Sequence, residues 1–301
     1  MYKETGSEGM RILILSRNAS LYSTQSLISA AIKRGHQIQV ADHLMCNLII
    51  EKGNPQLYVG LDPIGPVDAV IPRIGASATE YGAAVIRQIE AMGIFTSVSS
   101  EALLKARNKL HCMQLLSQAG LDIPKSGISG GDLCAGLVYE QISHEKAVVK
   151  LLSSTQGLGV ILTQSKNQGI SIIEGFHRVG QDVMIQEFVS DAKGSDIRAF
   201  VVDGEIVGSM IRQAVPGEFR SNIHRGASAF MVELTDQERH AAITASKLLG
   251  LSIAGVDILR SSRGPLILEV NASPGLEGIE GTTKADIAGK IISYIERHVN
   301  K

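Results

Sequence analysis

The stretch AGVDILRSSRGPLILEVNASPG, residues 254–275, predicts the element around which the rest of the chain is arranged. Two apolar runs, at 253–259 and 266–270, lie on either side of the polar segment RSSRGP. Apolar runs separated by turn residues predict a β-hairpin, and this connection is expected to be longer than the tightest two-residue turn.

Three oxygen-bearing side chains of this hairpin are expected on one face. Side chains alternate along a strand, so Glu269 and Asn271 share a face. If the turn centres near residues 262–263, Asp257 lies across from residues 268–269 and can point the same way as Glu269. Two facing carboxylates repel each other unless positive charge lies between them. Mg²⁺ would supply that charge, because it prefers carboxylate and amide oxygens together with phosphate oxygens. The alternative is a structural pair, with one acid protonated or bonded to Arg260 or Arg263.

The composition is that of a globular protein. The chain has 301 residues, of which 44% are hydrophobic and 20% charged, enough for one large or two to three ordinary domains. A net charge of -1 gives no strong field for nucleic acid or an anionic membrane, so we expect neither as a direct partner. No apolar run approaches the roughly 20 residues that span a bilayer. Residues 1–9 lack the apolar core of a secretory signal and are interpreted as a disordered extension.

The cysteines give no sign of a disulfide framework. Cys46, Cys112 and Cys134 are odd in number and widely spaced, and they form no CxxC metal pair. This usage suits a reducing compartment and favours a cytoplasmic protein in which all three cysteines serve packing.

Residues 10–100 alternate between strand and helix patterns, which predicts an α/β domain with a parallel sheet. No G-x-G-x-x-G follows a strand, so nothing indicates a dinucleotide site. Arg73, in the segment PRIG, follows the carboxyl end of a predicted strand, where open α/β sheets place ligands. It could bind a substrate carboxylate there, and a surface arginine is the alternative.

Two lysines stand out in the middle of the chain. The apolar spacing over 100–119 predicts one helix with Lys109 in its middle, where an exposed lysine is the ordinary reading. Lys150 lies inside an apolar strand at 147–152, and buried lysines are rare unless paired. The segment SSTQGLGV at 153–160 follows at once, and its small residues allow backbone N–H groups to face an anion. A strand lysine directly before such a loop indicates phosphate binding.

A group of arginines and polar residues follows the strand that carries Asp196 and Arg198 on one face. Arginine forks match the oxygens of phosphate and carboxylate, so this segment predicts a clamp for either group, with a solvated basic loop as the alternative. The residues are Arg212, Arg220, Asn222, His224 and Arg225.

In their order along the chain, these features resemble the ATP-grasp superfamily, and most closely the RimK-type ligases that attach glutamate to a ribosomal protein. The resemblance covers residues 10–299 and is carried by RNKLHCMQLL, VVKLLSSTQGLGV, SDIRAFVV, FRSNIHRG, AGVDILR and LILEVNASPGLEGIE. It implies an α/β (α+β) fold with a Rossmann-like pre-ATP-grasp domain at 10–100. A two-subdomain ATP-grasp fold follows, with subdomain A at 101–190 and subdomain B, holding the metal site, at 191–301.

The resemblance also implies roles for individual residues. It places the nucleotide against a first set: Lys109, Lys150, Gly157, Gly159, Glu187, Phe188, Val189, Asp196, Arg220, Ser221 and Asn222. The lysines would contact the phosphates, the backbone at 187–189 would hold adenine, and Arg220 and Asn222 would also reach the reacting groups together with Arg212. Mg²⁺ or Mn²⁺, as two ions, would be held by Asp257, Glu269 and Asn271. Substrate contacts would come from Arg73, Ser273 and Gly275.

The implied activity is an ATP-dependent carboxylate–amine ligase that adds L-glutamate to the C-terminal carboxylate of a small-subunit ribosomal protein through an acyl phosphate. The resemblance further implies a homo-oligomer, such as a tetramer. One alternative is a related ligase with another peptide or cofactor as acceptor. Another is a non-catalytic nucleotide-binding regulator, which predicts a damaged metal triad or missing lysines.

Overall fold

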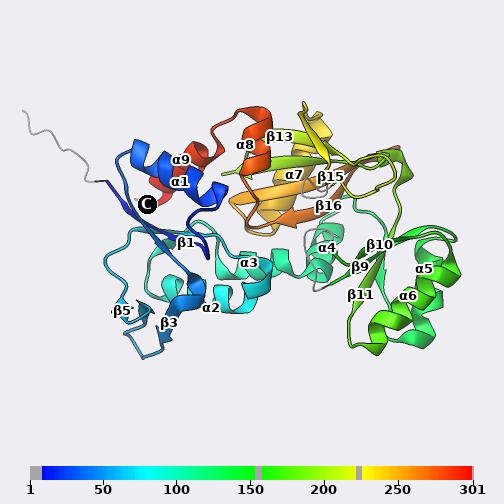
Figure 1. Cartoon of the computed structure of the whole chain (residues 1–301), viewed down its shortest axis with the longest axis horizontal. Helices are drawn as coiled ribbons and strands as arrows, with labels where there is room; N and C mark the ends of the chain where they lie inside the picture. The colour runs from blue at the N-terminus through cyan, green and yellow to red at the C-terminus, as the bar shows by residue number, and fades with distance from the viewer. Residues whose placement is uncertain (1–8, 153–157, 222–225, 300–301) are drawn as a thin grey trace, which may run out of the picture.

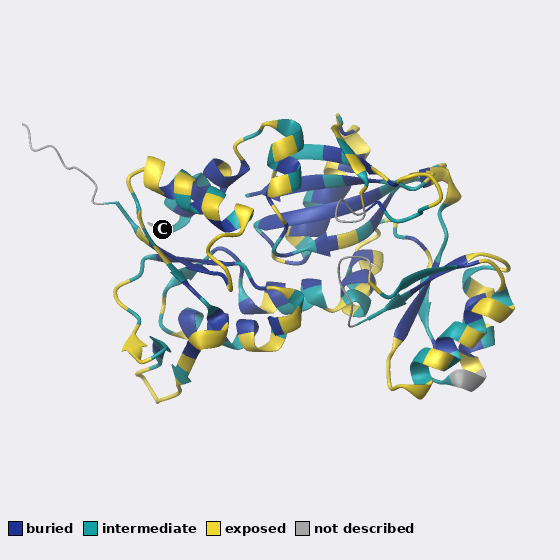
Figure 2. Cartoon of the chain, in the orientation of Figure 1, coloured by how far each residue is buried: buried dark blue, intermediate teal, exposed yellow. Residues whose placement is uncertain are grey.

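The protein is built on four β-sheets, as Figure 1 shows for the computed structural model, which describes residues 9–152, 158–221 and 226–299. Helices cover the outer faces of the sheets, and the strands beneath them are the most buried elements (Figure 2). Residues 1–8 of the predicted N-terminal extension lie outside the described part. Within it, no helix has both the length and the apolar character needed to cross a membrane.

The N-terminal sheet has the strand order β2-β1-β6-β7, with every neighbouring pair parallel. This confirms the parallel α/β arrangement predicted from the alternating pattern. A small antiparallel sheet, β3-β4-β5, projects beside it. The elements are β1 (Arg11–Leu15), α1 (Tyr22–Lys33), β2 (Gln37–Ala41), β3 (Cys46–Ile49), β4 (Gln56–Val59), β5 (Asp62–Pro63), β6 (Ala69–Pro72), α2 (Thr79–Ala91) and β7 (Phe95–Thr96).

The prediction of a single helix over 100–119 is wrong, because the helix is interrupted at Asn108. Two helices form instead, α3 (Ser100–Arg107) and α4 (Lys109–Gln118). Asn108 has an extended backbone, and its side-chain oxygen accepts a hydrogen bond from the His111 N–H at 3.0 Å, which caps α4. Lys109 is therefore the first residue of a helix and lies at a corner.

The second sheet is antiparallel, with the order β10-β9-β11-β8, and two helices pack on one of its faces. This sheet and its helices have a hydrophobic core of their own, which includes Tyr139 and Val149. The elements are β8 (Ser126–Ile128), α5 (Asp132–Ile142), β9 (Ala147–Leu151), β10 (Val160–Thr163), α6 (Lys166–Arg178) and β11 (Val183–Glu187).

The largest sheet has the order β14-β13-β12-β15-β16 and contains the predicted hairpin as its last two strands. Thr235 and Glu238 form a capping box at the start of α7. The elements are β12 (Ser195–Val202), β13 (Glu205–Gln213), β14 (Ser228–Met231), α7 (Asp236–Leu248), β15 (Ile253–Ser261), β16 (Gly264–Asn271), α8 (Glu277–Thr283) and α9 (Ile287–Val299).

The turn of the hairpin is shorter than predicted. Ser261 pairs with Gly264, so the polar ends of RSSRGP continue the ladder and two residues connect the strands. The Ser261 hydroxyl donates to the Gly264 carbonyl at 2.8 Å, and Gly264 has a φ of 105°, which favours glycine. Counting only apolar residues therefore placed the strand ends too far from the turn.

The last helix joins the two ends of the chain. Helix α9 lies against α1 and shares a hydrophobic core with the N-terminal sheet (Figure 1). Another core links that sheet with α3, α4, α7 and the hairpin. The hairpin is therefore fixed relative to the N-terminal sheet, which positions the loops at the carboxyl end of β6 beside the end of β16.

Candidate functional site

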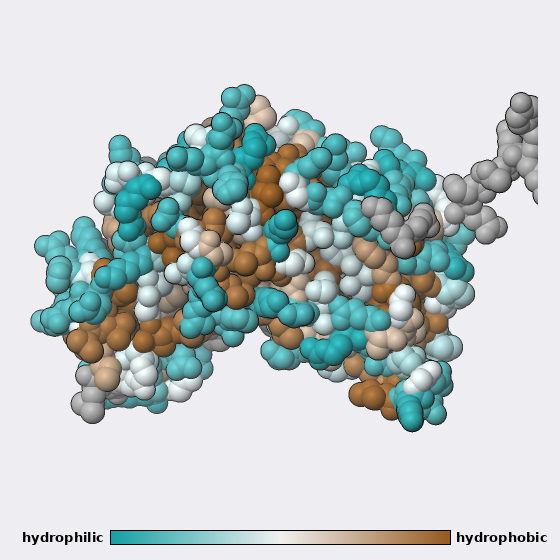
Figure 3. Space-filling view, turned by 180° about the vertical axis from the view of Figure 1, so that it is seen from behind, coloured by the Kyte–Doolittle hydropathy of each residue, from teal (hydrophilic) through white to brown (hydrophobic). Residues whose placement is uncertain are grey.

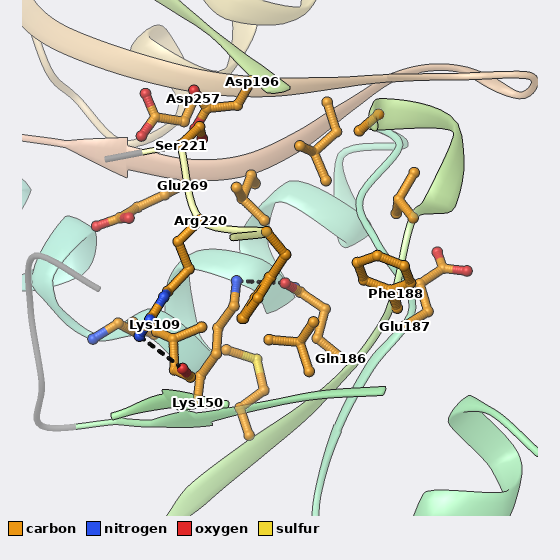
Figure 4. A pocket seen from close by; sticks show the side chains of 18 of the residues that line it. Lys109, Lys150, Gln186, Glu187, Phe188, Asp196, Arg220, Ser221, Asp257 and Glu269 are labelled. Atoms are coloured by element: carbon orange, nitrogen blue, oxygen red, sulfur yellow. Dashed lines mark hydrogen bonds between the residues drawn. The ribbon is translucent and has the colours of Figure 1, made fainter. Parts of the chain in front are cut away.

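A pocket lies between the antiparallel sheet that contains β9 and β11 and the sheet that contains β15 and β16. Figure 4 shows polar side chains from both sheets pointing into it. Part of its wall is apolar, with Met184, Leu259 and Leu268 among the lining residues. Such a wall can hold a flat ring, while the charged groups around it hold polar substituents.

Lys150 lies on β9, and its ammonium points into the pocket. Its Nζ donates to Gln186 Oε1 on β11 at 2.5 Å, and Gln186 is held in turn by its Nε2 donating to Ser126 Oγ at 2.8 Å. Burial lowers the pKa of Lys150 to about 8. Its hydrogen-bond partner is an amide, and among the described residues no carboxylate lies within ion-pair distance of this positive charge.

Lys109 approaches the same pocket from the start of α4. Its Nζ donates to the carbonyl of Leu152, directly before the small-residue loop, at 3.0 Å. Burial lowers the pKa of Lys109, and the more distant charge of Glu269 acts in the opposite direction. The structure thus brings together the two lysines predicted for phosphate contact, from a helix and a strand (Figure 4).

Only part of the predicted phosphate loop can be placed. Gly157 lies outside the described residues, whereas Gly159 has a φ of 62° and accepts a hydrogen bond from the Leu151 N–H at 2.9 Å. A Cβ at Gly159 would lie 2.4 Å from Leu151 Cδ1, so this position requires glycine.

The end of β11 forms another edge of the pocket. The Glu187 carboxylate accepts from the backbone N–H of Lys125 at 2.7 Å and also from the Arg263 guanidinium. The Glu187 side chain is therefore occupied by contacts within the protein, which leaves the backbone of this residue to face the pocket. Phe188 and Val189 complete the edge, and Phe188 meets the ring of Phe219 edge-on with centroids 6.5 Å apart.

Asp257 takes part in a buried network of ion pairs. Arg198 donates to both of its oxygens, at 2.5 and 2.7 Å, and Arg212 reaches Oδ2 at 2.9 Å. Arg212 also binds Asp196 through two hydrogen bonds of 2.6 and 2.5 Å across the β12–β13 register. Burial raises the pKa of Asp257, but Arg198 and then Arg212 outweigh it and hold the pKa below its usual value.

The network corrects two alternatives from the sequence. Asp257 is not bonded to Arg260 or Arg263, which pair with Glu238 and Glu187. Arg212 is not part of a loop clamp, because β13 extends to Gln213 and places it in the sheet. Arg198 is the residue whose role sequence reasoning missed. Its position on the same strand face as Asp196 was visible, but its partner lies on a distant strand.

The three predicted metal ligands meet on the hairpin. Asp257 pairs with Glu269 in the β15–β16 register, and a bulge follows Asp257. With its amide oriented to satisfy both neighbours, Asn271 donates to Glu269 Oε1 and accepts from Arg198 Nη2, each at 3.3 Å. Two carboxylates and an amide oxygen are a donor set that fits a hard divalent cation. No cluster of three His, Cys, Asp or Glu side chains suited to a metal occurs within residues 9–152, 158–221 and 226–299.

Arg220 lies over the mouth of the pocket. It donates to the Glu218 carboxylate at 2.9 and 2.7 Å and to the Val160 carbonyl at 3.3 Å, and its guanidinium sits 5.5 Å from the Phe219 ring centroid. These contacts tie the segment to the edge of β10. Ser221 is buried beside it and lines the pocket. Asn222, together with His224 and Arg225 of the predicted clamp, lies outside the described residues.

The predicted substrate residues lie away from this pocket, beside the end of the hairpin. Arg73 is half-buried, and its Nη2 donates to the Pro274 carbonyl at 2.7 Å. The reading of Arg73 as an ordinary surface arginine is therefore wrong. Ser273 has a buried hydroxyl, and Gly275 is exposed.

Family models match almost the whole chain. Residues 10–103 match the RimK PreATP-grasp domain, and residues 106–295 match the RimK-like ATP-grasp domain. A protein of Pseudomonas savastanoi pv. phaseolicola named probable alpha-L-glutamate ligase is 48% identical over 289 residues, which cover 96% of both chains. A Vibrio cholerae protein of the same name is 47% identical over 96% of both chains.

Solved structures are similar in fold. The ATP-grasp ligase PsnB, complexed with a phosphomimetic variant of its minimal precursor, Mg and ADP, gives a TM-score of 0.73. Its sequence is 20% identical, over 97% of this chain and 99% of that chain.

Proposed function

We propose, because this chain belongs to the RimK-like ATP-grasp family, that it joins the amino group of L-glutamate to an acceptor carboxylate. The chain is an ATP-dependent carboxylate–amine ligase of that family, and the proposal concerns its substrates and the roles of its residues. The shared name of relatives that are 47% and 48% identical over nearly their whole length supports glutamate as the amine.

The observation that carries the proposal is the opposition of two kinds of charge across one pocket. Lys109 and Lys150 enter it from one side, and Asp257 and Glu269 line the other (Figure 4). A nucleotide triphosphate needs cations at its phosphate oxygens and an apolar surface for its base. Lys109, Lys150 and Arg220 would bind the phosphates, and the backbone at 187–189 would face adenine beside Phe188.

The hairpin would hold Mg²⁺, or Mn²⁺, as two ions. When bound by Asp257, Glu269 and Asn271, the metal supplies positive charge to the phosphate oxygens. Arg198 and Arg212 keep the Asp257 carboxylate ionised and oriented. Asp196 acts through Arg212 and so supports the same group from beneath.

The chemistry needs no protein nucleophile. An oxygen of the acceptor carboxylate attacks the γ-phosphorus of ATP, the bond to the β-phosphate oxygen breaks, and ADP leaves. The amine of glutamate then attacks the carbonyl of the acyl phosphate, and inorganic phosphate leaves as the amide forms and the amine loses a proton. Both steps depend on positioning and on neutralising charge, which Lys109, Lys150, Arg212 and Arg220 would provide.

The acceptor is proposed to be the C-terminal tail of a small-subunit ribosomal protein. A second, wider groove supports an extended acceptor, because it runs from the start of α2 along α3 to Lys109, Glu269 and Asn271. It meets the nucleotide pocket at Lys109 and Glu269, which line both, and a terminal carboxylate would approach the γ-phosphate there. Another peptide or a cofactor could use the same groove, so the groove alone does not distinguish these acceptors.

We also propose a homo-oligomer, such as a tetramer, in the cytoplasm. Ile49, Ile50 and Leu61 of the small β3–β5 sheet and its loops are exposed, at 46%, 88% and 95%. This sheet forms the tip at the lower right of Figure 3, where hydrophobic atoms gather. Apolar side chains at such a tip support burial between copies. The three cysteines are free, as expected in a reducing compartment.

The proposal is tested by incubating the protein with ATP, Mg²⁺, L-glutamate and a panel of acceptors, and reading the acceptor masses. The panel contains ribosomal-protein tails, unrelated acidic peptides and small carboxylates. Addition of glutamyl residues to ribosomal tails alone is the expected result. Glutamylation of another member would reassign the acceptor, and ATP binding without any product would favour the regulator alternative.

A further inference from the structure

Two arginines and a serine with unused hydrogen-bonding capacity converge where the N-terminal sheet meets the end of the hairpin. Arg73 follows β6, Arg107 ends α3, and Ser273 follows β16. Arg73 Nη2 donates to the Pro274 carbonyl at 2.7 Å, and Arg107 Nη2 donates to the Ile74 carbonyl at 2.6 Å. These contacts tie both guanidiniums to the backbone of one junction, while most of their N–H groups donate no hydrogen bond to another described residue.

In the described part of the chain, no direct ion pair balances the charge of this pair, although the more distant Glu269 carboxylate partly offsets the charge of Arg107. Among the described residues, neither arginine has a carboxylate within 4.0 Å, whereas Arg198, Arg212 and Arg220 all do. Burial and, to a smaller extent, the neighbouring charge of Arg107 lower the pKa of Arg73 to about 10. Two like charges placed together in a partly desolvated position cost free energy unless an anion joins them.

Two buried polar atoms at the junction also have no hydrogen-bond partner. They are Arg107 Nε and the Ser273 hydroxyl oxygen. Buried groups of this kind are rare in folded proteins, and each calls for an explanation such as a missing ligand. A guanidinium edge and a hydroxyl are donors that match the two oxygens of a carboxylate.

We propose that Arg73, Arg107 and Ser273 form a binding site for a substrate carboxylate that does not react. The proposal rests on the proposed ligase function and extends it by naming Arg107, which the sequence did not single out. Arg107 lines the wide groove, along with Lys109, Glu269 and Asn271. A carboxylate held there leaves the rest of its molecule directed toward the nucleotide phosphates. The reacting groups would then meet at the place where groove and pocket join.

Two substrates could supply this carboxylate. Free L-glutamate must present its amine while both of its carboxylates stay bound away from the acyl phosphate. An acceptor tail that already ends in glutamates also carries a side-chain carboxylate near its reacting end. The chemistry recognised is the same, so the test separates the two sources.

The test uses Arg107→Met, with Arg107→Lys as the conservative variant and Arg87→Met as the matched control. Arg87 lines the same groove but is exposed, and its side chain bonds to none of the described residues. For each protein, KM is measured for L-glutamate and for a peptide acceptor ending in two glutamates, and Kd is measured for a non-hydrolysable ATP analogue. Loss of a hydrogen bond to a charged group corresponds to a change of about tenfold or more.

A rise of about tenfold in the KM for glutamate alone would assign the site to free glutamate, and a rise for the peptide alone would assign it to the tail. In the first case, one of the analogues L-glutamine and glutamate α-amide lacks the carboxylate that Arg107 would bind. The wild type and Arg107→Met should use that analogue equally poorly. Arg107→Lys should recover part of the loss, and the Kd of the ATP analogue should stay unchanged. Unchanged KM values for both substrates in a folded, active variant would overturn the proposal.

Binding measurements separate this site from the ligase proposal itself. If the wild-type protein binds the ATP analogue but forms no amide, the ligase proposal fails. Calorimetric titration of L-glutamate, and separately of the peptide, into the protein with ADP and Mg²⁺ would still test the site. Weaker binding of one ligand by Arg107→Met but not by Arg87→Met supports it, and equal binding by both variants contradicts it. If Arg107→Met does not fold, Ser273→Ala replaces it in the same assays.

Discussion

Replacing Lys150 with methionine should stabilise the ligand-free protein and weaken nucleotide binding at the same time. Methionine keeps the apolar stem but removes an ammonium that is buried next to an amide. The pKa falls from 10.5 to about 8 on folding. Each pKa unit corresponds to about 1.4 kcal/mol, so the buried charge costs up to about 3 kcal/mol near pH 7. Removing it should raise the melting temperature of the free protein by several degrees.

The same substitution removes a cation proposed to contact the phosphates. A hydrogen bond to a charged group is worth about 1.5–3 kcal/mol, which corresponds to roughly a 10- to 150-fold rise in the Kd for ATP. The assay is thermal melting with and without ATP and Mg²⁺, combined with calorimetric titration of the nucleotide. The variant should melt above the wild type without ATP, and its melting temperature should rise less when ATP is added.

Lys290→Met is the matched control, because Lys290 is an exposed lysine on α9 and does not line the pocket. This control should shift the melting temperature by no more than about a degree and leave the Kd for ATP unchanged. Surface substitutions usually change the free energy of unfolding by no more than about 0.5 kcal/mol. If Lys150→Met folds normally but leaves both melting and nucleotide affinity unchanged, the reasoning about a buried, phosphate-directed charge is refuted.

Three further outcomes follow from the site. The Kd for the nucleotide, measured between pH 7 and 9.5, should rise above about pH 8, because Lys150 loses its proton. The free energy of unfolding should increase as the pH rises from about 8 to 10.5, because in this range the unfolded chain holds a proton that the folded Lys150 has lost. Asp257→Asn should abolish amide formation and cost about 3–5 kcal/mol in urea unfolding, because Arg198 loses its buried partner; near-normal turnover would contradict this. Gly159→Ala should cost at least about 1 kcal/mol in the same unfolding assay, because its Cβ would meet Leu151 at a positive φ; an unchanged unfolding midpoint would contradict this.

Local patterns predicted the parts of the fold that depend on neighbouring residues. The hairpin, with Asp257 across from Glu269, was predicted because alternation and register act over a few residues. The position of Lys150 before the loop followed in the same way. The break at Asn108 was missed, although an asparagine three residues before His111 is a recognisable helix cap.

Contacts between distant segments were not predicted. Nothing near Arg198 in the sequence indicates that Asp257, 59 positions later, will be its partner. Arg107 likewise reads as an ordinary helical residue until the end of α3 is brought beside Ile74 and the loop after β16. Tertiary packing decides which charges are compensated, so the unbalanced arginine pair became visible only in three dimensions.

The central claim is that a carboxylate is activated by phosphorylation and then converted to an amide by glutamate. Transfer of a heavy-oxygen label tests it most directly. An acceptor labelled with ¹⁸O in its terminal carboxylate is incubated with the protein, ATP, Mg²⁺ and L-glutamate, and the released phosphate is examined by mass spectrometry. One labelled oxygen per phosphate, in step with the glutamyl groups added, is the predicted result. Unlabelled phosphate released alongside the amide would contradict the account.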